Sequence, residues 1–459
     1  MQGKTKGIHF VGIGGAGMSG IATVMLGMGG YQVSGSDLKS TATTERLASL
    51  GATCYTGHAA ENLKDVDMLV VSTAIADDNP EVVAAKRMGI PIVRRGEMLA
   101  RLMKEKQGIA VAGAHGKTTT TSMTALVLEM NGLDPTILIG GDLSYIGGNA
   151  KLGRGDYLVA EADESDGSFL LLDPVVAVVT NIEDDHLDYY GSRENIVKAF
   201  REFLNKVPES GLAVVCGDDP TVRQLIADLT CPLVTYGSYN SGADYTIDSF
   251  ALQGETTLGQ VSFRGEKLGQ LVLNVPGYHN LLNALAVVAV GRYVGLSFSQ
   301  IAAALREFKG AKRRYQLIGE VKGAKIVDDY AHHPTEIKAT LQAARQAHPG
   351  RIIAVFQPHR FTRTRQLFRE FGESFAHADI LILTDIYPAG EKPIEGVHTK
   401  LIVDAIAKRP NQQVIYLPTL EEATNFLTQQ VTEGDLVLTM GAGDVWTVGR
   451  ELLQRMGEG

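Results

Sequence analysis

Cysteine is scarce in this sequence. Only Cys54, Cys216 and Cys231 occur among 459 residues, and they lie far apart. Three dispersed cysteines lack both the paired spacing of a zinc site and the even number of a disulfide framework. We therefore expect neither a structural zinc finger nor a disulfide-stapled fold, and a reducing compartment fits best.

Long apolar runs and an excess of positive charge are also missing. No run of 18 or more apolar residues occurs, and the N-terminus lacks the features of a secretion signal. The formal net charge of -9 would repel nucleic acid and anionic lipid surfaces. We expect a cytoplasmic protein without membrane insertion or a nucleic-acid partner, and both a monomer and a homodimer are compatible with the sequence.

The amino-acid composition is that of an ordered globular protein, and the chain is too long for a single hydrophobic core. Hydrophobic residues make up 44% and charged residues 21% of the 459 residues, and typical domains hold roughly 100 to 200 residues. Short apolar runs alternate with amphipathic stretches, which is typical of an α/β fold. We predict three domains, 1–106, 107–312 and 313–459, each built on a mainly parallel sheet with flanking helices. Period-2 alternation with glycine turns over residues 243–275 predicts a small antiparallel meander in the central domain.

A glycine-rich turn follows the first predicted strand and begins a helical stretch. Its backbone N–H groups and the helix dipole suit a pyrophosphate. Asp37 lies 20 residues beyond Gly17, where a carboxylate accepts hydrogen bonds from a ribose. Because NAD and UDP-sugars share the pyrophosphate-ribose unit, an NAD(P)-dependent oxidoreductase is one interpretation and a UDP-sugar enzyme is the other. The candidate UDP-sugar residues are Gly12, Gly14, Gly15, Ala16, Gly17, Asp37 and Ser72.

A second glycine turn has the character of a phosphate loop in a short form. Only two residues separate Gly113 from Gly116, whereas the standard motif has four. Its backbone N–H groups would point at phosphate oxygens, Lys117 would neutralise the β- and γ-phosphates, and Thr118 would offer a hydroxyl to Mg²⁺. The predicted ATP residues here are Gly113, Ala114, His115, Gly116, Lys117, Thr118 and Thr119. A plain oxidoreductase has no use for this second nucleotide site.

Two acidic loops follow predicted strands next to this turn. Residues 161–166 (EADESD) and 181–188 (NIEDDHLD) both come directly after apolar runs. Carboxylates beside a phosphate loop would repel ATP unless cations lie between them, which predicts Mg²⁺, with two ions expected. The candidate ligands are Thr118, Glu161 and His186.

The last third of the chain supplies further polar segments after predicted strands. Residues 328–334 (DDYAHHP) contain adjacent histidines without nearby cysteine, so we do not expect zinc. Arg360 and Arg363 suit a bidentate carboxylate clamp. Earlier, Asn280 and Asn283 lie one helical turn apart, where they suit an adenine edge or a helix cap.

Taken in order, these signatures resemble those of the Mur ligases, the ATP-dependent amino acid ligases of peptidoglycan precursor synthesis. The resemblance spans the chain and is carried by HFVGIGGAGMSG, AGAHGKTTTT, EADESDGSF, NIEDDHLDYYG, PGYHNLLNALA, DDYAHHPTE, FQPHRFTRTR and DIYPAGE. It is strongest to the members that add L-alanine. It implies an N-terminal UDP-sugar domain, a central ATPase domain and a C-terminal Rossmann-like domain for the amino acid.

The resemblance also implies roles for individual residues. Lys117, His186 and Arg314 are the implied catalytic residues, and Asn280, Asn283, Arg314 and Asp329 join the phosphate loop at the nucleotide. The implied amino-acid residues are Tyr330, His332, Arg360 and Arg363.

The implied reaction is amide formation between the lactyl carboxylate of UDP-N-acetylmuramic acid and L-alanine, through an acyl phosphate, with release of ADP and phosphate. Within the family, the alternative is the recycling ligase that adds a ready-made peptide to the same UDP-sugar, and discrimination rests on EADESDGSF and DIYPAGE. The alternative of another class, the oxidoreductase, explains the first glycine turn alone.

Overall fold

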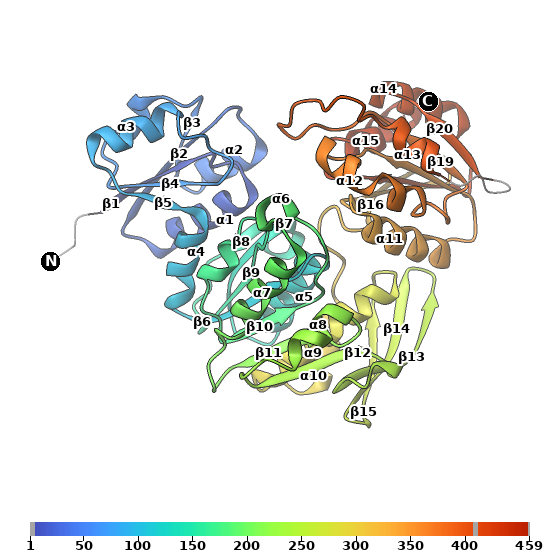
Figure 1. Cartoon of the computed structure of the whole chain (residues 1–459), viewed down its shortest axis with the longest axis horizontal. Helices are drawn as coiled ribbons and strands as arrows, with labels where there is room; N and C mark the ends of the chain where they lie inside the picture. Colours follow the sequence, from blue (N-terminus) through green and yellow to red (C-terminus); the bar gives the residue numbers. More distant parts are fainter. Residues whose placement is uncertain (1–4, 407–411, 458–459) are drawn as a thin grey trace. The chain divides into compact units, whose positions relative to one another are not determined.

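Three β-sheets flanked by helices make up the structure, a computed structural model that describes residues 5–406 and 412–457 (Figure 1). By contacts the chain forms two compact units. One unit takes in the first two sheets, and the other takes in the third sheet together with residues 250–259 and 272–281. Each unit is described by itself.

The first sheet has five parallel strands in the order β3-β2-β1-β4-β5. In β1 every residue after Lys6 is buried, as expected of a strand with both faces covered. The strands are β1 (Lys6–Val11), β2 (Tyr31–Asp37), β3 (Thr53–Thr56), β4 (Met68–Val71) and β5 (Ile92–Arg94), and the helices are α1 (Ala16–Met28), α2 (Ala42–Ser49), η1 (Ala60–Leu63), α3 (Pro80–Met88) and α4 (Arg95–Lys104).

The second sheet has ten strands in the order β15-β14-β13-β12-β11-β10-β6-β9-β7-β8. Its strands are β6 (Gln107–Ala112), β7 (Thr136–Leu143), β8 (Gly148–Lys151), β9 (Tyr157–Glu161), β10 (Val176–Val179), β11 (Leu212–Cys216), β12 (Leu233–Ser238), β13 (Tyr245–Gln253), β14 (Thr256–Phe263) and β15 (Glu266–Leu273). Its helices are α5 (Lys117–Met130), η2 (Ser144–Ile146), η3 (Ser168–Leu171), α6 (Leu187–Tyr190), α7 (Arg193–Leu204), α8 (Pro220–Ile226), η4 (Tyr239–Ser241), α9 (Tyr278–Tyr293) and α10 (Phe298–Arg306). The predicted meander is present as β13, β14 and β15, and it extends one edge of this sheet.

The third sheet has six strands in the order β16-β17-β21-β18-β19-β20. Its strands are β16 (Gln316–Val321), β17 (Ala324–Asp329), β18 (Ile352–Phe356), β19 (Ile380–Leu383), β20 (Gln413–Tyr416) and β21 (Leu436–Met440). Its helices are α11 (Pro334–Ala347), α12 (Phe361–Gly372), α13 (Lys400–Ala405), α14 (Leu420–Gln430) and α15 (Trp446–Gly457).

The predicted fold class, mainly parallel sheets with flanking helices, is confirmed. β16 pairs antiparallel to β17, and its register shifts between Leu317 and Gly319. A short strand interrupted by a bulge at glycine lacks the regular alternation by which a strand is recognised in sequence. The exact domain boundaries stay a prediction.

Strand order explains why the polar segments of the first unit gather at the carboxyl ends of neighbouring strands in the central sheet. β6 lies between β10 and β9, and all three strands run parallel. The second glycine turn follows β6, and the two acidic loops follow β9 and β10. Side chains beyond the carboxyl ends of neighbouring parallel strands share one crevice.

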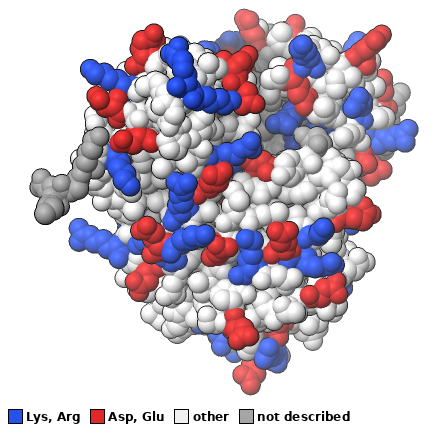
Figure 2. All heavy atoms as spheres, turned by 60° about the vertical axis from the view of Figure 1, so that its left-hand side comes forward, with Lys and Arg blue, Asp and Glu red and all other residues white. Residues whose placement is uncertain are grey.

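Surface charge is mixed. On the face drawn in Figure 2, Lys and Arg side chains are interspersed with Asp and Glu, without a continuous basic area. Across residues 5–406 and 412–457, no helix combines the length and apolar character needed to cross a membrane.

The first domain contains a fully buried carboxylate, that of Glu81. It accepts hydrogen bonds from Ser36 Oγ at 2.6 Å and Asn62 Nδ2 at 2.6 Å, and it lies 3.4 Å from the imidazole of His9. Burial by itself raises the pKa of Glu81, but the nearby His9 and the hydrogen bonds from Ser36 and Asn62 outweigh it and lower the pKa to about 2. The ionised carboxylate therefore stabilises the fold at neutral pH.

Glu81→Gln should lower the free energy of unfolding at pH 7 by about 1–3 kcal/mol, because an amide cannot accept the same set of hydrogen bonds. Since the folded-state pKa is depressed from 4.5, the carboxylate's contribution is complete above about pH 4.5 and is lost as the pH falls toward about 2. Denaturant titrations over this range should show the difference from the unsubstituted protein shrinking on acidification. Glu61→Gln, on the exposed surface, is the matched control, and equal stability of both variants would contradict the account.

Candidate active site

One cleft of about 410 Å³ in the first unit contains residues from both glycine-turn domains. From the first domain it is lined by predicted residues of the glycine turn and by the end of β4. From the central domain it is lined by the phosphate-loop lysine and the first acidic loop. The predicted residues that line it are Gly12, Gly15, Ala16, Gly17, Ser72, Lys117 and Glu161. A ligand held at the first turn therefore shares its cavity with Lys117.

The first glycine turn is braced by Asp37. The N–H group of Gly14 donates to Asp37 Oδ2 at 2.9 Å. A Cβ on Gly14 would lie 2.8 Å from the same oxygen, so a larger residue would displace the Asp37 carboxylate. Asp37 thus shapes the turn, and its predicted contact with a ribose stays a prediction.

The second glycine turn is held against the end of β10. The N–H group of His115 donates to Asn181 Oδ1 at 2.8 Å, and that of Ala114 donates to Asn181 O at 3.2 Å. Gly113 has a φ of 130°, and a Cβ there would lie 2.1 Å from Thr180 Oγ1. The close approach requires glycine, and Asn181 is a contributor that the sequence did not single out.

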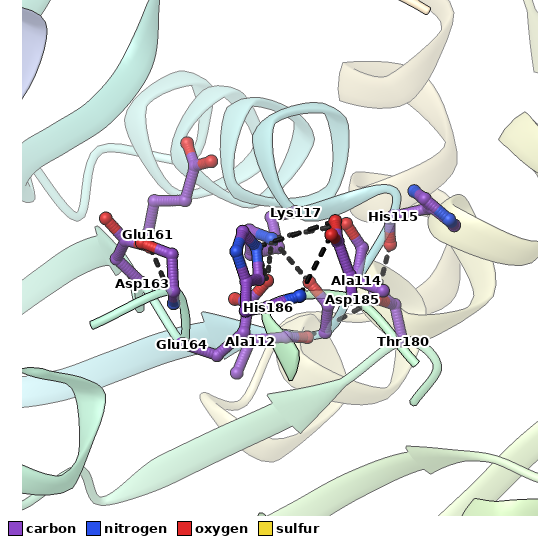
Figure 3. A network of polar contacts seen from close by, with 12 residues as sticks. Ala112, Ala114, His115, Lys117, Glu161, Asp163, Glu164, Thr180, Asp185 and His186 are labelled. Atoms are coloured by element: carbon purple, nitrogen blue, oxygen red, sulfur yellow. Dashed lines mark hydrogen bonds and ion pairs between the residues drawn. The ribbon is translucent and has the colours of Figure 1, made fainter. Parts of the chain in front are cut away.

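Lys117 lies at the centre of a network of polar contacts (Figure 3). Its Nζ donates to Gly113 O at 2.5 Å and to Glu164 Oε1 at 2.7 Å. Burial by itself lowers the pKa of Lys117, but the charge of Glu164 outweighs it and the pKa is raised. Burial also raises the pKa of Glu164, to about 7, against the opposing attraction of Lys117. Lys117 is therefore a permanent cation in the cleft.

Thr118 and Glu161 form the best-defined pair for a magnesium ion. Thr118 Oγ1 donates to Glu161 Oε1 at 3.0 Å, and Glu161 Oε2 accepts from Gly140 N at 2.7 Å. Hard oxygen donors of this kind suit Mg²⁺. Glu164 Oε2 is buried and accepts no hydrogen bond from any residue that the structure describes, which adds a third oxygen to the same region.

His186 lies beside Lys117 in Figure 3. It directly precedes α6, in the left-handed conformation, with φ 58°. Its Nε2 is 3.5 Å from Asp185 Oδ2 and 3.9 Å from Glu164 Oε1. The structure thus groups His186 with Lys117 and Glu164, and its predicted metal contact stays a prediction.

The two predicted adenine residues differ in their surroundings. Asn283 lies against the phosphate loop, because a Cβ on Gly116 would be only 2.6 Å from its Oδ1. Asn280 is buried, and its Nδ2 donates to the carbonyl oxygen of Pro276 at 2.8 Å, four residues earlier. The predicted adenine contact of both asparagines stays a prediction.

In the second unit, Asp329 is enclosed by backbone. Its two oxygens accept from Tyr315 N and Ala331 N, each at 2.7 Å. Burial raises the pKa of Asp329 to about 6, with Arg314 opposing the shift. The guanidinium of Arg314 lies 5.3 Å from the ring centre of Tyr330 and 3.5 Å from Glu336. The predicted nucleotide contacts of Arg314 and Asp329 stay predictions.

Four rings and an arginine cluster at the ends of β17, β18 and β19. The rings of Tyr330 and His332 are 5.3 Å apart, those of His332 and His359 are 5.8 Å apart, and those of His359 and Tyr387 stack at 5.6 Å. Arg363 Nη1 lies 3.4 Å from His359 Nδ1. Burial lowers the pKa of His332 to about 3 and that of His359 to about 4, so both imidazoles are neutral at physiological pH.

Arg360 has an unusual backbone conformation. It precedes α12 with φ 71°, a value that residues other than glycine rarely adopt. Its N–H group donates to Tyr387 O at 2.8 Å. Its Nε is buried and donates to none of the described residues. Strain of this kind is found at binding sites.

Comparisons with known proteins decide the family. Profiles of the Mur ligase family catalytic domain, the Mur ligase middle domain and the Mur ligase glutamate ligase domain match residues 7–107, 111–291 and 313–443. The UDP-N-acetylmuramate–L-alanine ligase of Desulforamulus reducens is 66% identical over all of this chain and 99% of its own length. The same-named ligase of Pelotomaculum thermopropionicum is 62% identical over 99% and 98%. The chain belongs to the Mur ligase family.

Solved structures of Mur ligases agree with this assignment. The UDP-N-acetylmuramate-alanine ligase of Thermotoga maritima has a TM-score of 0.85 at 32% identity, covering 98% of this chain and 99% of that one. A murein peptide ligase from Psychrobacter arcticus has a TM-score of 0.72 at 25% identity, with the same coverage. As a Mur ligase the chain is an ATP-dependent amide-bond ligase, and the oxidoreductase interpretation of the first turn is wrong.

Several residues of this Mur ligase site were missed in sequence. Glu164, Asn181 and His359 lie inside segments that were recognised as motifs, but nothing local distinguishes them from their neighbours. Their roles come from contacts across strands, such as the ion pair of Glu164 with Lys117, 47 residues away.

Gly116→Ala should weaken ADP binding at least tenfold, because φ is 83° and the added Cβ would lie 2.6 Å from Asn283 Oδ1. Gly132→Ala is the matched control: its φ is 75°, yet no heavy atom lies within 4 Å of the added Cβ. The control isolates the backbone cost and should keep its ADP affinity. Calorimetric titration measures both, and normal binding by Gly116→Ala would contradict the close contact at the loop.

Proposed function

We propose that this Mur ligase joins L-alanine to the lactyl carboxylate of UDP-N-acetylmuramic acid, forming ADP and phosphate, in peptidoglycan precursor synthesis. The main support for the proposal is the cleft that the first glycine turn shares with Lys117. A sugar nucleotide held at the turn would have its far end directed along the same cavity as the phosphate loop. The carboxylate to be activated and the phosphoryl group to be transferred would then meet.

The UDP-sugar would bind across the first domain. Its pyrophosphate suits the N-terminus of α1, where backbone N–H groups and the helix dipole favour anions. Gly12, Gly15, Ala16, Gly17 and Ser72 line the cleft. Asp37, which braces the turn through Gly14, is adjacent to this site.

ATP would bind at the second turn, with its phosphates at the N-terminus of α5. Lys117 would neutralise the β- and γ-phosphates in place of the contact it makes with Glu164. Thr118 and Glu161 would hold Mg²⁺, with His186 the candidate ligand for a second ion. Bound there, Mg²⁺ neutralises phosphate charge and so favours phosphoryl transfer.

The chemistry follows from the poor electrophilicity of a carboxylate. A carboxylate oxygen of the sugar attacks the γ-phosphorus, the bond to ADP breaks, and an acyl phosphate forms. The amine of alanine then attacks the acyl carbon, and phosphate leaves. Lys117 stabilises charge in the first step, and no protein nucleophile is needed.

Alanine would bind at the ring cluster of the third sheet. Arg360 and Arg363 suit its carboxylate, and Tyr330 and His332 would enclose its methyl group. The neutral imidazoles of His332 and His359 add no positive charge that would repel the ammonium group. Arg314 and Asp329 keep the nucleotide role that the family resemblance implies for them.

The recycling ligase is the alternative within the family. Identities of 66% and 62% to alanine ligases, against 25% and 31% to two solved peptide-adding ligases, favour alanine. We also propose a cytoplasmic location, because ATP is available there and the few cysteines suit a reducing compartment.

A competition assay tests the proposed function. Purified protein with ATP, Mg²⁺ and UDP-N-acetylmuramic acid is given equal L-alanine, glycine, L-serine and the recycled tripeptide, and product masses are measured. The alanyl product should dominate, and ADP release should need both the sugar and an amino acid. Lys117→Ala should lower the rate by at least about a hundredfold, while Lys64→Ala, on the exposed surface, should not. Dominant tripeptide product would overturn the alanine assignment.

A further inference from the structure

Arg95 is a second cation in the shared cleft, besides Lys117. It is the first residue of α4, and its side chain is 19% exposed. It lines the cleft together with Gly17 of the first turn and Asp163 of the first acidic loop. A mostly buried guanidinium is stable only with anionic groups close to it.

One end of the guanidinium is held by the acidic loop. Arg95 Nη2 donates to Asp163 Oδ2 at 2.9 Å, and the same nitrogen is 3.7 Å from Asp166 Oδ2. This is the one hydrogen bond that Arg95 makes to a described residue, although a guanidinium carries five N–H donors. Most of its donor capacity is therefore open to a ligand.

The other end of the guanidinium lies over the first glycine turn. A Cβ placed on Gly17 would be 3.0 Å from Arg95 Nη1 and 2.9 Å from its Cδ. Gly17 is in the first turn of α1, whose N-terminal N–H groups point toward the space where an anion is favoured. Nη1 is thus placed beside that anion position.

Close helix contact sets this placement. A Cβ on Gly96, the residue after Arg95, would lie 2.5 Å from Ser168 Cβ at the start of η3. The N-terminus of α4 therefore abuts the end of the acidic loop. The backbone of Arg95 is therefore fixed next to the loop, and the hydrogen bond to Asp163 holds the guanidinium between the loop and the first glycine turn.

We propose that Arg95 binds the pyrophosphate of the UDP-sugar through Nη1, and that Asp163 is the positioning residue that holds the guanidinium for it. The proposal rests on the proposed function and adds to it a specific cation for the sugar nucleotide. A planar guanidinium can bridge two oxygen groups with separate nitrogens, which the single ammonium of lysine cannot do. The same bridge would join the ligand of the first domain to the acidic loop of the ATPase domain.

Calorimetric titration of the full-length protein with UDP, UDP-N-acetylmuramic acid and ADP tests the proposal. Arg95→Gln should weaken UDP and UDP-N-acetylmuramic acid alike, by roughly ten- to a hundredfold, the range of a lost charge-assisted hydrogen bond. ADP affinity should stay within about threefold, which also shows that the variant is folded. Arg94→Gln, an exposed neighbour of the same charge, is the matched control and should bind all three normally.

Asp163→Asn tests the positioning role. It should weaken UDP by a smaller factor, and the same substitution should have no further effect once Arg95 is Gln, because Asp163 acts through Arg95. Equal, additive losses from the two substitutions would contradict the positioning role. Arg95→Lys should recover only part of the affinity.

The outcomes separate this proposal from the function it rests on. If the unsubstituted protein fails to bind UDP-N-acetylmuramic acid, the proposed function fails. If the unsubstituted protein binds the sugar nucleotide and Arg95→Gln binds UDP equally well, the Arg95 proposal is overturned. The same holds if Arg95→Gln weakens the binding of UDP-N-acetylmuramic acid but not that of UDP, a result that would assign Arg95 to the lactyl carboxylate instead of the pyrophosphate.

Discussion

The buried ammonium of Lys117 is the constraint around which the site is organised. A charge removed from water must be paired closely or it destabilises the fold by several kcal/mol. Lys117 meets this requirement with the carbonyl of Gly113 and the carboxylate of Glu164. Both partners belong to loops that follow neighbouring strands, so Lys117 holds the phosphate loop and the first acidic loop together.

The same contacts place the ammonium group of Lys117 where a bound phosphate would need it. ATP offers Lys117 more negative charge than one carboxylate does, so nucleotide can displace Glu164 without leaving the ammonium unpaired. The pKa of Glu164, raised to about 7 by burial, means that this carboxyl can take up a proton once the ammonium turns away. Thr118 and Glu161, already in contact at 3.0 Å, provide oxygens for Mg²⁺ beside the same phosphates.

The features that could be predicted from sequence are those dictated by local backbone geometry. Gly12, Gly113 and Gly116 have positive φ in turns after strands, and their motifs predict the two phosphate-binding turns. The α/β class followed from alternating apolar runs. Contacts that depend on strand order could not be predicted in this way. The pairing of Lys117 with Glu164 and the position of Arg95 over Gly17 require β6 to lie between β9 and β10 and the first domain to pack on the central one. The ring of Tyr387 stacks on His359 because β18 and β19 are neighbours.

The shared cleft would bring the sugar carboxylate to the γ-phosphoryl group, and oxygen-isotope transfer detects the phosphorylation that follows. UDP-N-acetylmuramic acid labelled with ¹⁸O in its lactyl carboxylate is converted with L-alanine, and the phosphate released is analysed by mass spectrometry. Direct phosphorylation of the carboxylate predicts one labelled oxygen in each phosphate formed. Unlabelled phosphate accompanying full product formation would contradict the account.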